Sequence, residues 1–172
     1  DLYEIKYGQN LPQDKIKESG MYEVYGASGI MGYHSQKNVS KKVALITSRG
    51  NGSSDIHRTY GESFVTNNSF IVRSKNKYLG LNFTLHHLET VGLINYCSGS
   101  AQPQLTNDAM KNIKIKLPDK ELLIKFNNFA ELLIEVSDNI RSQNQLLKEA
   151  RDILLPRLMT GMIDTDDMDI AV

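Results

Sequence analysis

A long heptad-patterned stretch near the C-terminus limits what this chain can fold into. In alternating steps of four and three residues through residues 119–155, nine of ten positions are apolar, which is the a/d pattern of a coiled-coil helix. These positions are Leu122, Phe126, Phe129, Leu133, Val136, Ile140, Gln143, Leu147, Ala150 and Leu154. A helix of roughly 35 residues is about 50 Å long, more than the rest of the chain can cover. Part of this seam is therefore predicted to meet another helix.

The two halves of the predicted helix differ in the width of their apolar stripe. Additional apolar residues widen the first half, as expected for a helix that packs on both a globular body and a partner helix. They are Leu123, Ile124, Ala130, Leu132 and Ile134. Residues 141–152 have polar flanks, which suit a solvated coiled coil, and Gln143 can fix its register. The alternative interpretation is a core helix of one monomeric domain.

Both ends of the helix carry recognisable signals. Asp119 can serve as the N-cap, and Pro156 predicts an end or a kink near Leu155 because proline has no N–H to donate. A last turn can follow, with Gly161 as a left-handed C-cap. Residues 162–172 are acidic and are expected to form a disordered tail. We therefore divide the chain into a head (1–118), a long helix (119–161) and this tail.

Charge is distributed unevenly between these parts. Residues 1–118 carry 14 Lys or Arg against 9 Asp or Glu, a balance of +5, whereas residues 119–172 carry 6 against 11, a balance of −5. A basic head favours a polyanionic partner. The net charge of zero conceals this difference.

Composition indicates the class of protein and its compartment. The single cysteine, Cys97, excludes an internal disulfide and fits a reducing compartment. No apolar run approaches 18 residues and no signal peptide is visible, so we expect a soluble, cytoplasmic protein. The chain begins with Asp1 rather than Met, so it can be trimmed or be part of a longer protein.

The head is predicted to be an α+β domain with small mixed sheets. Its expected strands are residues 21–25, 43–47, 62–66, 69–74, 91–96 and 112–117. A helix is expected at 77–89, and Thr106 can cap a short helix through Met110. Asn67 and Asn68 are expected to join two strands in a tight, hairpin-like turn. The glycines between residues 26 and 32 indicate a turn-rich loop.

The sequence contains no motif that would make this chain an enzyme. The segment YGASGI lacks the second glycine of a nucleophile elbow, because Ile30 occupies its place. The phosphate-binding GxxxxGK[ST], HExxH and CxxC motifs are absent. His86 and His87 point to different faces of a predicted helix and are interpreted as core or surface residues. We expect no catalytic residue, no metal ligand and no cofactor in this chain.

Two polar loops of the head are rich in side chains that bond to bases and phosphates. Arg pairs with guanine and Asn or Gln with adenine, while Ser and Lys suit phosphates. The first loop contains Ser48, Arg49, Asn51, Ser53, Ser54, His57 and Arg58, and the second contains Ser98, Ser100, Gln102 and Gln104. Lys41 and Lys42 can anchor a nucleic-acid backbone. The alternative is that these are ordinary solvated loops.

Five segments in order resemble the specificity subunit of type I restriction-modification enzymes. They are GMYEVYGASGIMGYHS, VALITSRGNGS, ESFVTNNSFIV, SGSAQPQLTNDAMKNIKIKLP and the long helix that ends in LLPRLMTGMI. The SGSAQPQL segment with the following KNIKIKLP is the most specific part. The family usually has two prolines and then Glu-Gln after the position of Leu117, where this chain has PDKEL.

The resemblance implies that the head is a target recognition domain that reads one half of a bipartite DNA site. The long helix would be a conserved spacer that lies antiparallel to a second such helix and docks modification subunits. The subunit itself would not be catalytic: S-adenosylmethionine, ATP and Mg would belong to the modification and restriction subunits. A full member has two heads and two helices, so this chain would be a half-length subunit that pairs with itself or one half of a longer chain.

The resemblance also places the DNA contacts in the loops of the head. The expected DNA-binding residues are Tyr33, His34, Lys41, Lys42, Arg49, Asn51, Ser53, Ser54, His57, Arg58, Ser100, Gln102 and Gln104. A rival interpretation is an interaction protein whose coiled coil assembles partners and whose head binds a protein.

Overall fold

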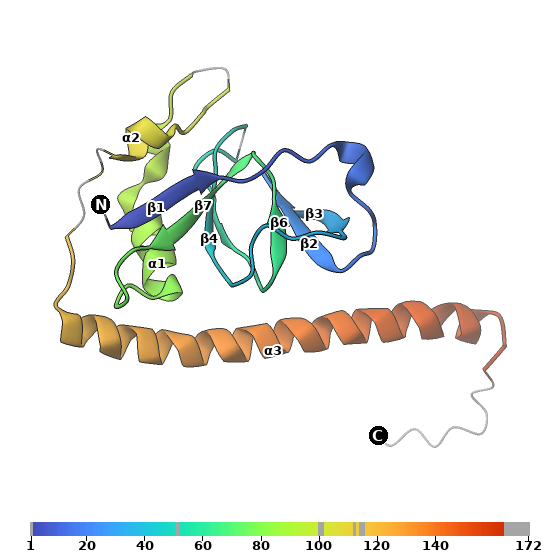
Figure 1. Ribbon diagram of the computed structural model, residues 1–172. Helices are drawn as coiled ribbons and strands as arrows, with labels where there is room; N and C mark the ends of the chain where they lie inside the picture. The colour runs from blue at the N-terminus through green and yellow to red at the C-terminus, as the bar shows by residue number, and fades with distance from the viewer. Residues whose placement is uncertain (1, 51, 100–101, 112, 114–115, 164–172) are drawn as a thin grey trace. The chain divides into compact units, whose positions relative to one another are not determined.

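The computed structural model describes residues 2–50, 52–99, 102–111, 113 and 116–163. It divides into two compact units, residues 1–130 and 131–172, which are treated separately below. The strands are β1 (Tyr3–Tyr7), β2 (Tyr22–Gly26), β3 (Gly29–His34), β4 (Ala44–Thr47), β5 (Ile56–Arg58), β6 (Ser63–Val65) and β7 (Ser69–Ser74) (Figure 1). The α-helices are α1 (Leu81–Val91), α2 (Asn107–Lys111) and α3 (Lys120–Met159), and short 3-10 helices lie at Gln13–Lys15 (η1) and Leu93–Tyr96 (η2).

Two small sheets form the head. One is antiparallel, with the strand order β1-β7-β4-β5, and the other has the order β3-β2-β6. In the second sheet β2 pairs antiparallel with β3 and parallel with β6. Figure 1 shows α1 and α2 on one side of the first sheet and the second sheet on the other side. The predicted α+β class is confirmed, and one of the two small sheets is mixed.

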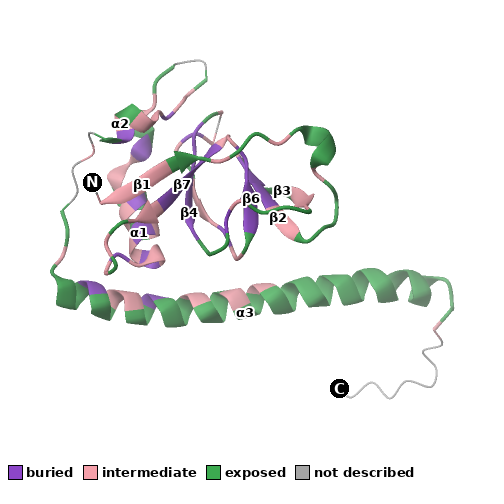
Figure 2. Cartoon of the chain, in the orientation of Figure 1, coloured by how far each residue is buried: buried purple, intermediate pink, exposed green. Residues whose placement is uncertain are grey.

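Alternate residues of the central strands face two different cores. Ala44 and Ile46 of β4 pack in a cluster with Leu88 of α1 and Met110 of α2. Leu45 packs instead in a cluster with Tyr25 and Val65 of the second sheet. Both faces of β4 are covered, so its residues form a continuous apolar run rather than an alternating one. Figure 2 shows the resulting buried layer in purple.

The predicted hairpin at Asn67 and Asn68 is wrong. The chain does turn there, with the amide of Ser69 donating to the carbonyl of Thr66 (3.2 Å), but β6 and β7 belong to different sheets. A turn signal reports a change of direction only, and here the apolar residues on both sides enter separate sheets. The segment therefore connects the two sheets.

The segment interpreted as a turn-rich loop forms a hairpin instead. Strand β3 pairs with β2, and the register shifts between Val24 and Tyr25. Gly32 lies opposite this irregularity with φ +144°, and a Cβ on it would approach the Lys17 carbonyl oxygen to 2.6 Å. The glycine thus permits a bulge inside a strand, which its turn-like appearance in sequence concealed.

The expected strand at residues 91–96 is also wrong. Val91 ends α1, Gly92 takes the left-handed conformation (φ +66°), and Leu93–Tyr96 form a 3-10 helix. Leu93 is buried in the α1 side of the core. A short apolar run cannot be assigned to strand or helix by its periodicity alone. Helix α1 also begins at Leu81, after Gly80, rather than at residue 77.

The connection to the long helix is described only in part. The amide of Ala109 donates to Thr106 Oγ1 (3.2 Å), which confirms the predicted cap of the short helix. The predicted strand at 112–117 includes residues 112, 114 and 115, which lie outside the described residues. Ile113, Lys116 and Leu117 lie in no strand, although Ile113 packs against the core.

Helix α3 begins as predicted and lies within the predicted bounds of residues 119–161. The amide of Leu122 donates to Asp119 Oδ1 (2.8 Å), which confirms the N-cap. Of the end or kink expected near Leu155, the end is wrong, because a proline removes a single hydrogen bond of the ladder and the helix continues through Pro156 to Met159. This continuation is the last turn that the sequence predicted. At the end the amide of Met162 donates to Arg157 and that of Gly161 (φ +69°) to Leu158. This is a Schellman motif with the predicted glycine at its left-handed position.

The first turns of α3 belong to the head unit, which extends to Ala130. Leu123 and Ala130 are buried, and Phe126 meets Phe83 of α1 edge to face at 5.9 Å between ring centroids. Asn127 donates to the Tyr78 carbonyl (2.8 Å). Leu123 and Ala130 of the widened stripe therefore pack on the globular body as predicted, whereas Ile124 and Leu132 are exposed.

Candidate nucleic-acid interface

The structure brings the two predicted loops together. The first loop follows β4 in the chain, and the second follows η2. Arg49 and Gln104 form an antiparallel bridge, and Gln104 also pairs with Ser98. The amide of Leu105, a fully buried residue, donates to the Ser48 carbonyl (3.0 Å). Segments distant in sequence therefore form one surface, which we call the paired loops (residues 48–50, 52–55, 98–99 and 102–104).

Backbone hydrogen bonds hold the first of the paired loops in a tight conformation. The amide of Ser54 donates to the Thr47 carbonyl, and that of Thr47 donates to the Asp55 carbonyl (both 2.8 Å). Ser54 has a φ of +78° and Gly50 a φ of +89°. Left-handed conformations are uncommon for residues other than glycine and are maintained only by surrounding contacts. The loop is thus preorganised by its own backbone.

Two serines of this loop are structural. Ser48 and Ser53 are buried. Ser48 Oγ donates to the Asn68 carbonyl (2.9 Å), and Ser53 Oγ lies 3.4 Å from both the Ser48 carbonyl oxygen and Cys97 Sγ. Ser53 therefore supports the paired loops from inside, and we leave it out of the proposed contact surface.

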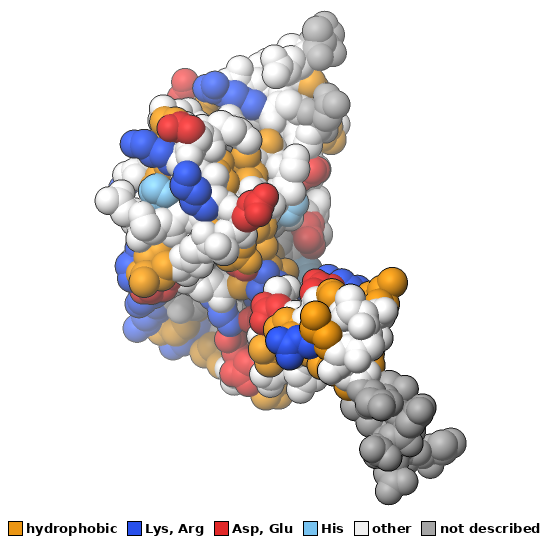
Figure 3. Space-filling model, turned by 90° about the vertical axis from the view of Figure 1, so that its right-hand side faces the viewer, with side chains coloured by type: hydrophobic (Ala, Val, Ile, Leu, Met, Phe, Trp, Pro, Cys, Tyr) orange, Lys and Arg blue, Asp and Glu red, His pale blue; other side chains and the backbone are white. Residues whose placement is uncertain are grey.

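The polar side chains that remain at the surface have the chemistry of base readout. Arg49 and Gln102 are exposed, and Gln104 and Ser54 are half-buried. The guanidinium of Arg49 is in no ion pair within the described part of the chain, so its donors are available to a ligand. A guanidinium pairs bidentately with guanine and an amide with adenine. Figure 3 shows one face of the molecule, on which Lys and Arg side chains (blue) lie among uncharged side chains and several Asp and Glu side chains (red).

His57 and Arg58 lie in a strand rather than in the polar loop. They belong to β5 at the edge of the first sheet, where His57 pairs with Leu45. The Nε2 atom of His57 is buried and has no hydrogen-bond partner among the described residues. The guanidinium of Arg58 lies 4.7 Å from the centroid of the Tyr60 ring, a cation–π contact. Pairing in the sheet therefore fixes the backbone of both residues, and both are half-buried.

The structure separates the other predicted DNA contacts from the paired loops. Lys41 and Lys42 are exposed and precede β4, whereas Arg49 follows it. Tyr33 and His34 end β3 in the second sheet. The edge of the His34 ring meets Phe64 (5.3 Å between centroids), and its Nδ1 lies 3.2 Å from the Lys15 carbonyl oxygen. Two further candidates, Asn51 and Ser100, lie outside the described residues.

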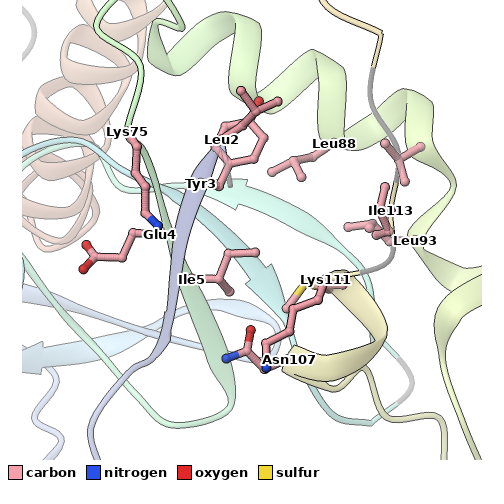
Figure 4. Close-up of a pocket in the computed structure, with 12 residues that line it drawn as sticks. Leu2, Tyr3, Glu4, Ile5, Lys75, Leu88, Leu93, Asn107, Lys111 and Ile113 are labelled. Carbon is pink, nitrogen blue, oxygen red and sulfur yellow. The ribbon is translucent and has the colours of Figure 1, made fainter.

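A pocket elsewhere on the head has a different character. Its volume is about 480 Å³, and it lies beside β1, with walls from α1, η2 and α2 (Figure 4). The labelled side chains include Leu2, Ile5, Leu88 and Leu93, which are apolar, and Lys75. None of the predicted DNA-binding residues lines this pocket.

Neither a metal centre nor a membrane span was found in the described segments. No group of three His, Cys, Asp or Glu residues within them could hold a metal ion. No helix within the same residues is long and apolar enough to cross a membrane.

Tyr3 Oη lies 3.1 Å from His87 Nδ1, and the ring of His87 stacks on Phe83 with 5.5 Å between the centroids. Burial lowers the pKa of this histidine. These contacts hold His87 in a half-buried position between β1 and α1.

Sequence analysis missed several residues that contact the predicted DNA-binding residues or lie beside them. The Asn68 carbonyl accepts a hydrogen bond from Ser48 Oγ, and the Tyr60 ring makes a cation–π contact with Arg58. Arg73 and Lys77 line a basic pocket with Lys41 and Lys42. No local sequence pattern signals these contacts, because each joins segments that meet only in the fold.

Known proteins resemble this chain over most of its length. Residues 1–147 match the family described as "Type I restriction modification DNA specificity domain". An Escherichia coli protein named "Type I restriction enzyme EcoprrI specificity subunit" is 26% identical over 148 residues, which are 80% of this chain and 37% of the relative. The chain therefore spans well under half the length of this relative.

Two solved structures share the fold. The S subunit of a type I restriction-modification system from M. genitalium superposes with a TM-score of 0.77 at 17% identity, over 92% of this chain and 44% of the other. A second structure, described as concerning complex assembly and conformational transition of the type I R-M system, gives a TM-score of 0.56 at 15% identity, over 91% and 43%. Together with the match over residues 1–147, these likenesses agree with the resemblance seen in the sequence motifs. The chain belongs to the family of type I restriction-modification DNA specificity domains.

Proposed function

We propose that this chain is a non-catalytic DNA-recognition unit whose head reads one half of a bipartite site. The observation that carries this proposal is the joining of the paired loops by the Arg49–Gln104 bridge. The bridge places a guanine-pairing and adenine-pairing set of side chains on one preorganised surface. A loop that is already ordered before binding loses less conformational entropy when it binds DNA.

We further propose that α3 pairs with a second long helix. Leu133, Val136, Ile140 and Leu147 are 56%, 58%, 53% and 66% exposed. Figure 2 shows the C-terminal half of α3 almost entirely in the colour of exposed residues, and Figure 3 shows hydrophobic side chains on its surface. An apolar stripe of this length in water favours a partner. The relatives are long enough to hold two such units, so the second helix comes from another copy of this chain or from the rest of a longer one.

The catalytic steps are assigned to other subunits. By family resemblance the modification subunit holds S-adenosylmethionine and the restriction subunit uses ATP and Mg, while α3 docks the modification subunits. The complete assembly would act on DNA in the cytoplasm. A palindromic site would indicate two copies of the same head, since a symmetric dimer reads symmetric half-sites.

DNA binding at several salt concentrations should distinguish this proposal from a protein-binding adaptor. The chain, assembled with its modification subunits, is expected to lose affinity for duplex DNA steeply as salt rises. The slope of log K against log [salt] should be about −0.9 for each phosphate contacted. Fluorescence anisotropy of a labelled duplex measures this slope. A flat dependence together with equal affinity for all duplexes would refute DNA recognition and favour the adaptor.

A further inference from the structure

A basic pocket lies at the end of the first sheet away from the paired loops. Its volume is about 300 Å³, and its walls come from the start of β4, the end of β7, the following loop and the first turn of α1. The lining residues include Lys41, Lys42, Arg73 and Lys77 but no acidic residue. Four cationic residues around one small concavity form a strongly anion-attracting site.

Arg73 shares its carboxylate contact with a lysine outside the pocket. Glu4 Oε2 lies 3.9 Å from the Arg73 guanidinium, whereas Glu4 Oε1 is 2.6 Å from Lys6. The hydrogen bond from Lys6 is the main cause that lowers the pKa of Glu4. Arg73 keeps 40% of its side chain exposed, so its donors remain accessible. The Lys77 ammonium lies 5.1 Å from the centroid of the Tyr78 ring, a contact that leaves its charge intact.

The backbone that carries these cations is held in place. Thr59 Oγ1 lies 3.0 Å from the Val43 amide and 3.5 Å from the Lys41 carbonyl oxygen, which fixes the entry to β4. On the other wall, Asn76 receives a hydrogen bond from Ser74 Oγ (2.7 Å) and accepts one from the Tyr78 amide (3.0 Å). These bonds fix the loop around Lys77. Hydrogen bonds therefore fix the backbone on both walls of the pocket.

We propose that this pocket binds a phosphodiester of the DNA backbone through Lys41, Arg73 and Lys77. This inference rests on the proposed function and adds Arg73 and Lys77 to the contact surface. Cationic side chains around a phosphate form charge-assisted hydrogen bonds, and the fork of an arginine matches phosphate oxygens. Lys41 and Arg49 are eight residues apart on either side of β4, so an extended chain places them up to about 26 Å apart. That distance is shorter than one turn of duplex DNA, about 34 Å, so one duplex can place base edges at the loops and a phosphate in the pocket.

The double variant Lys41→Gln/Lys77→Gln tests this site in the chain assembled with its modification subunits. It should weaken binding by the same factor for duplexes with and without the recognised motif, because a phosphate contact carries no sequence information. The slope of log K against log [salt] should become less steep by about 1.8, since two contacts are lost. The matched control is Lys111→Gln/Lys125→Gln. It removes the same charge from two exposed lysines that each already lie 2.7 Å from a carboxylate, and it should leave the slope unchanged.

Equal slopes for the two double variants would overturn the assignment. Calorimetric titration with inorganic phosphate alone gives the second arm. If the wild type bound free phosphate, the pocket variant did not, and the DNA slopes stayed equal, the pocket would be a small-anion site instead. Failure of the proposed function is distinguishable, because the wild-type assembly would then show no preference for any DNA sequence.

Discussion

Replacing Leu133 and Ile140 together with Asp should convert a self-paired form of this chain into a monomer. Both positions lie on the heptad seam, and more than half of each side chain is exposed, as expected for a surface that awaits a partner helix. Losing a buried Leu or Ile costs about 2–5 kcal/mol per site, and a carboxylate in its place adds a desolvation penalty. A pair of identical chains carries each substitution twice, so the lower limit for four sites is about 8 kcal/mol and the dissociation constant rises by about a million-fold.

Light scattering at fixed chain concentration measures this change as a halved mass. The matched control is Ser142→Asp/Gln145→Asp, which places the same two charges on exposed residues of α3 that lie off the seam. The control should keep the mass of the wild type. If the seam variant kept its mass as well, pairing of two copies through α3 would be disproved. If the wild type itself were monomeric, the second helix would have to come from the rest of a longer chain.

Replacing Arg49 with Ala should lower the affinity for the recognised DNA by about 1–3 kcal/mol and relax the preference at one base position. The bridge to Gln104 is made by the backbone, so truncating the side chain leaves the paired loops intact. The expected loss is that of a bidentate pair with guanine. Binding measured on duplexes that differ at single positions reports both effects.

Arg49→Lys is the matched variant for this prediction. It keeps the positive charge but loses the planar fork that pairs with guanine. We therefore expect it to lose the base preference while the slope of log K against log [salt] stays as in the wild type. If Arg49→Ala instead weakened binding equally on all sequences and reduced the slope, Arg49 would be a phosphate contact.

The features that could be predicted from sequence are those with a strong local signal. The heptad pattern predicted α3, and the acid of Asp119 and the glycine at 161 predicted its caps. The apolar run at residues 43–47 predicted a strand, and the structure shows that both faces of β4 are covered. Each of these signals lies within one segment of the chain and agrees with the fold around it.

The features that could not be predicted depend on pairing between distant segments. Asn67 and Asn68 signalled a turn, but only the fold decides that β6 and β7 enter different sheets. The run from Val91 to Tyr96 suits a strand or a helix equally. The two polar loops could be identified, but not that Gln104 would pair with Arg49. The sequence also could not show that the polar side chain of Ser53 is buried beside Cys97.

A map of methylated adenine across the genome, with and without this gene, tests the central claim most directly. In cells with an active modification subunit, deleting the gene should abolish methylation at one split motif and leave other methylated motifs unchanged. Arg49→Ala in place of the deletion should broaden that motif at one position of a half-site. An unchanged map after deletion in such cells would contradict the assignment of this chain as the unit that selects the DNA sequence.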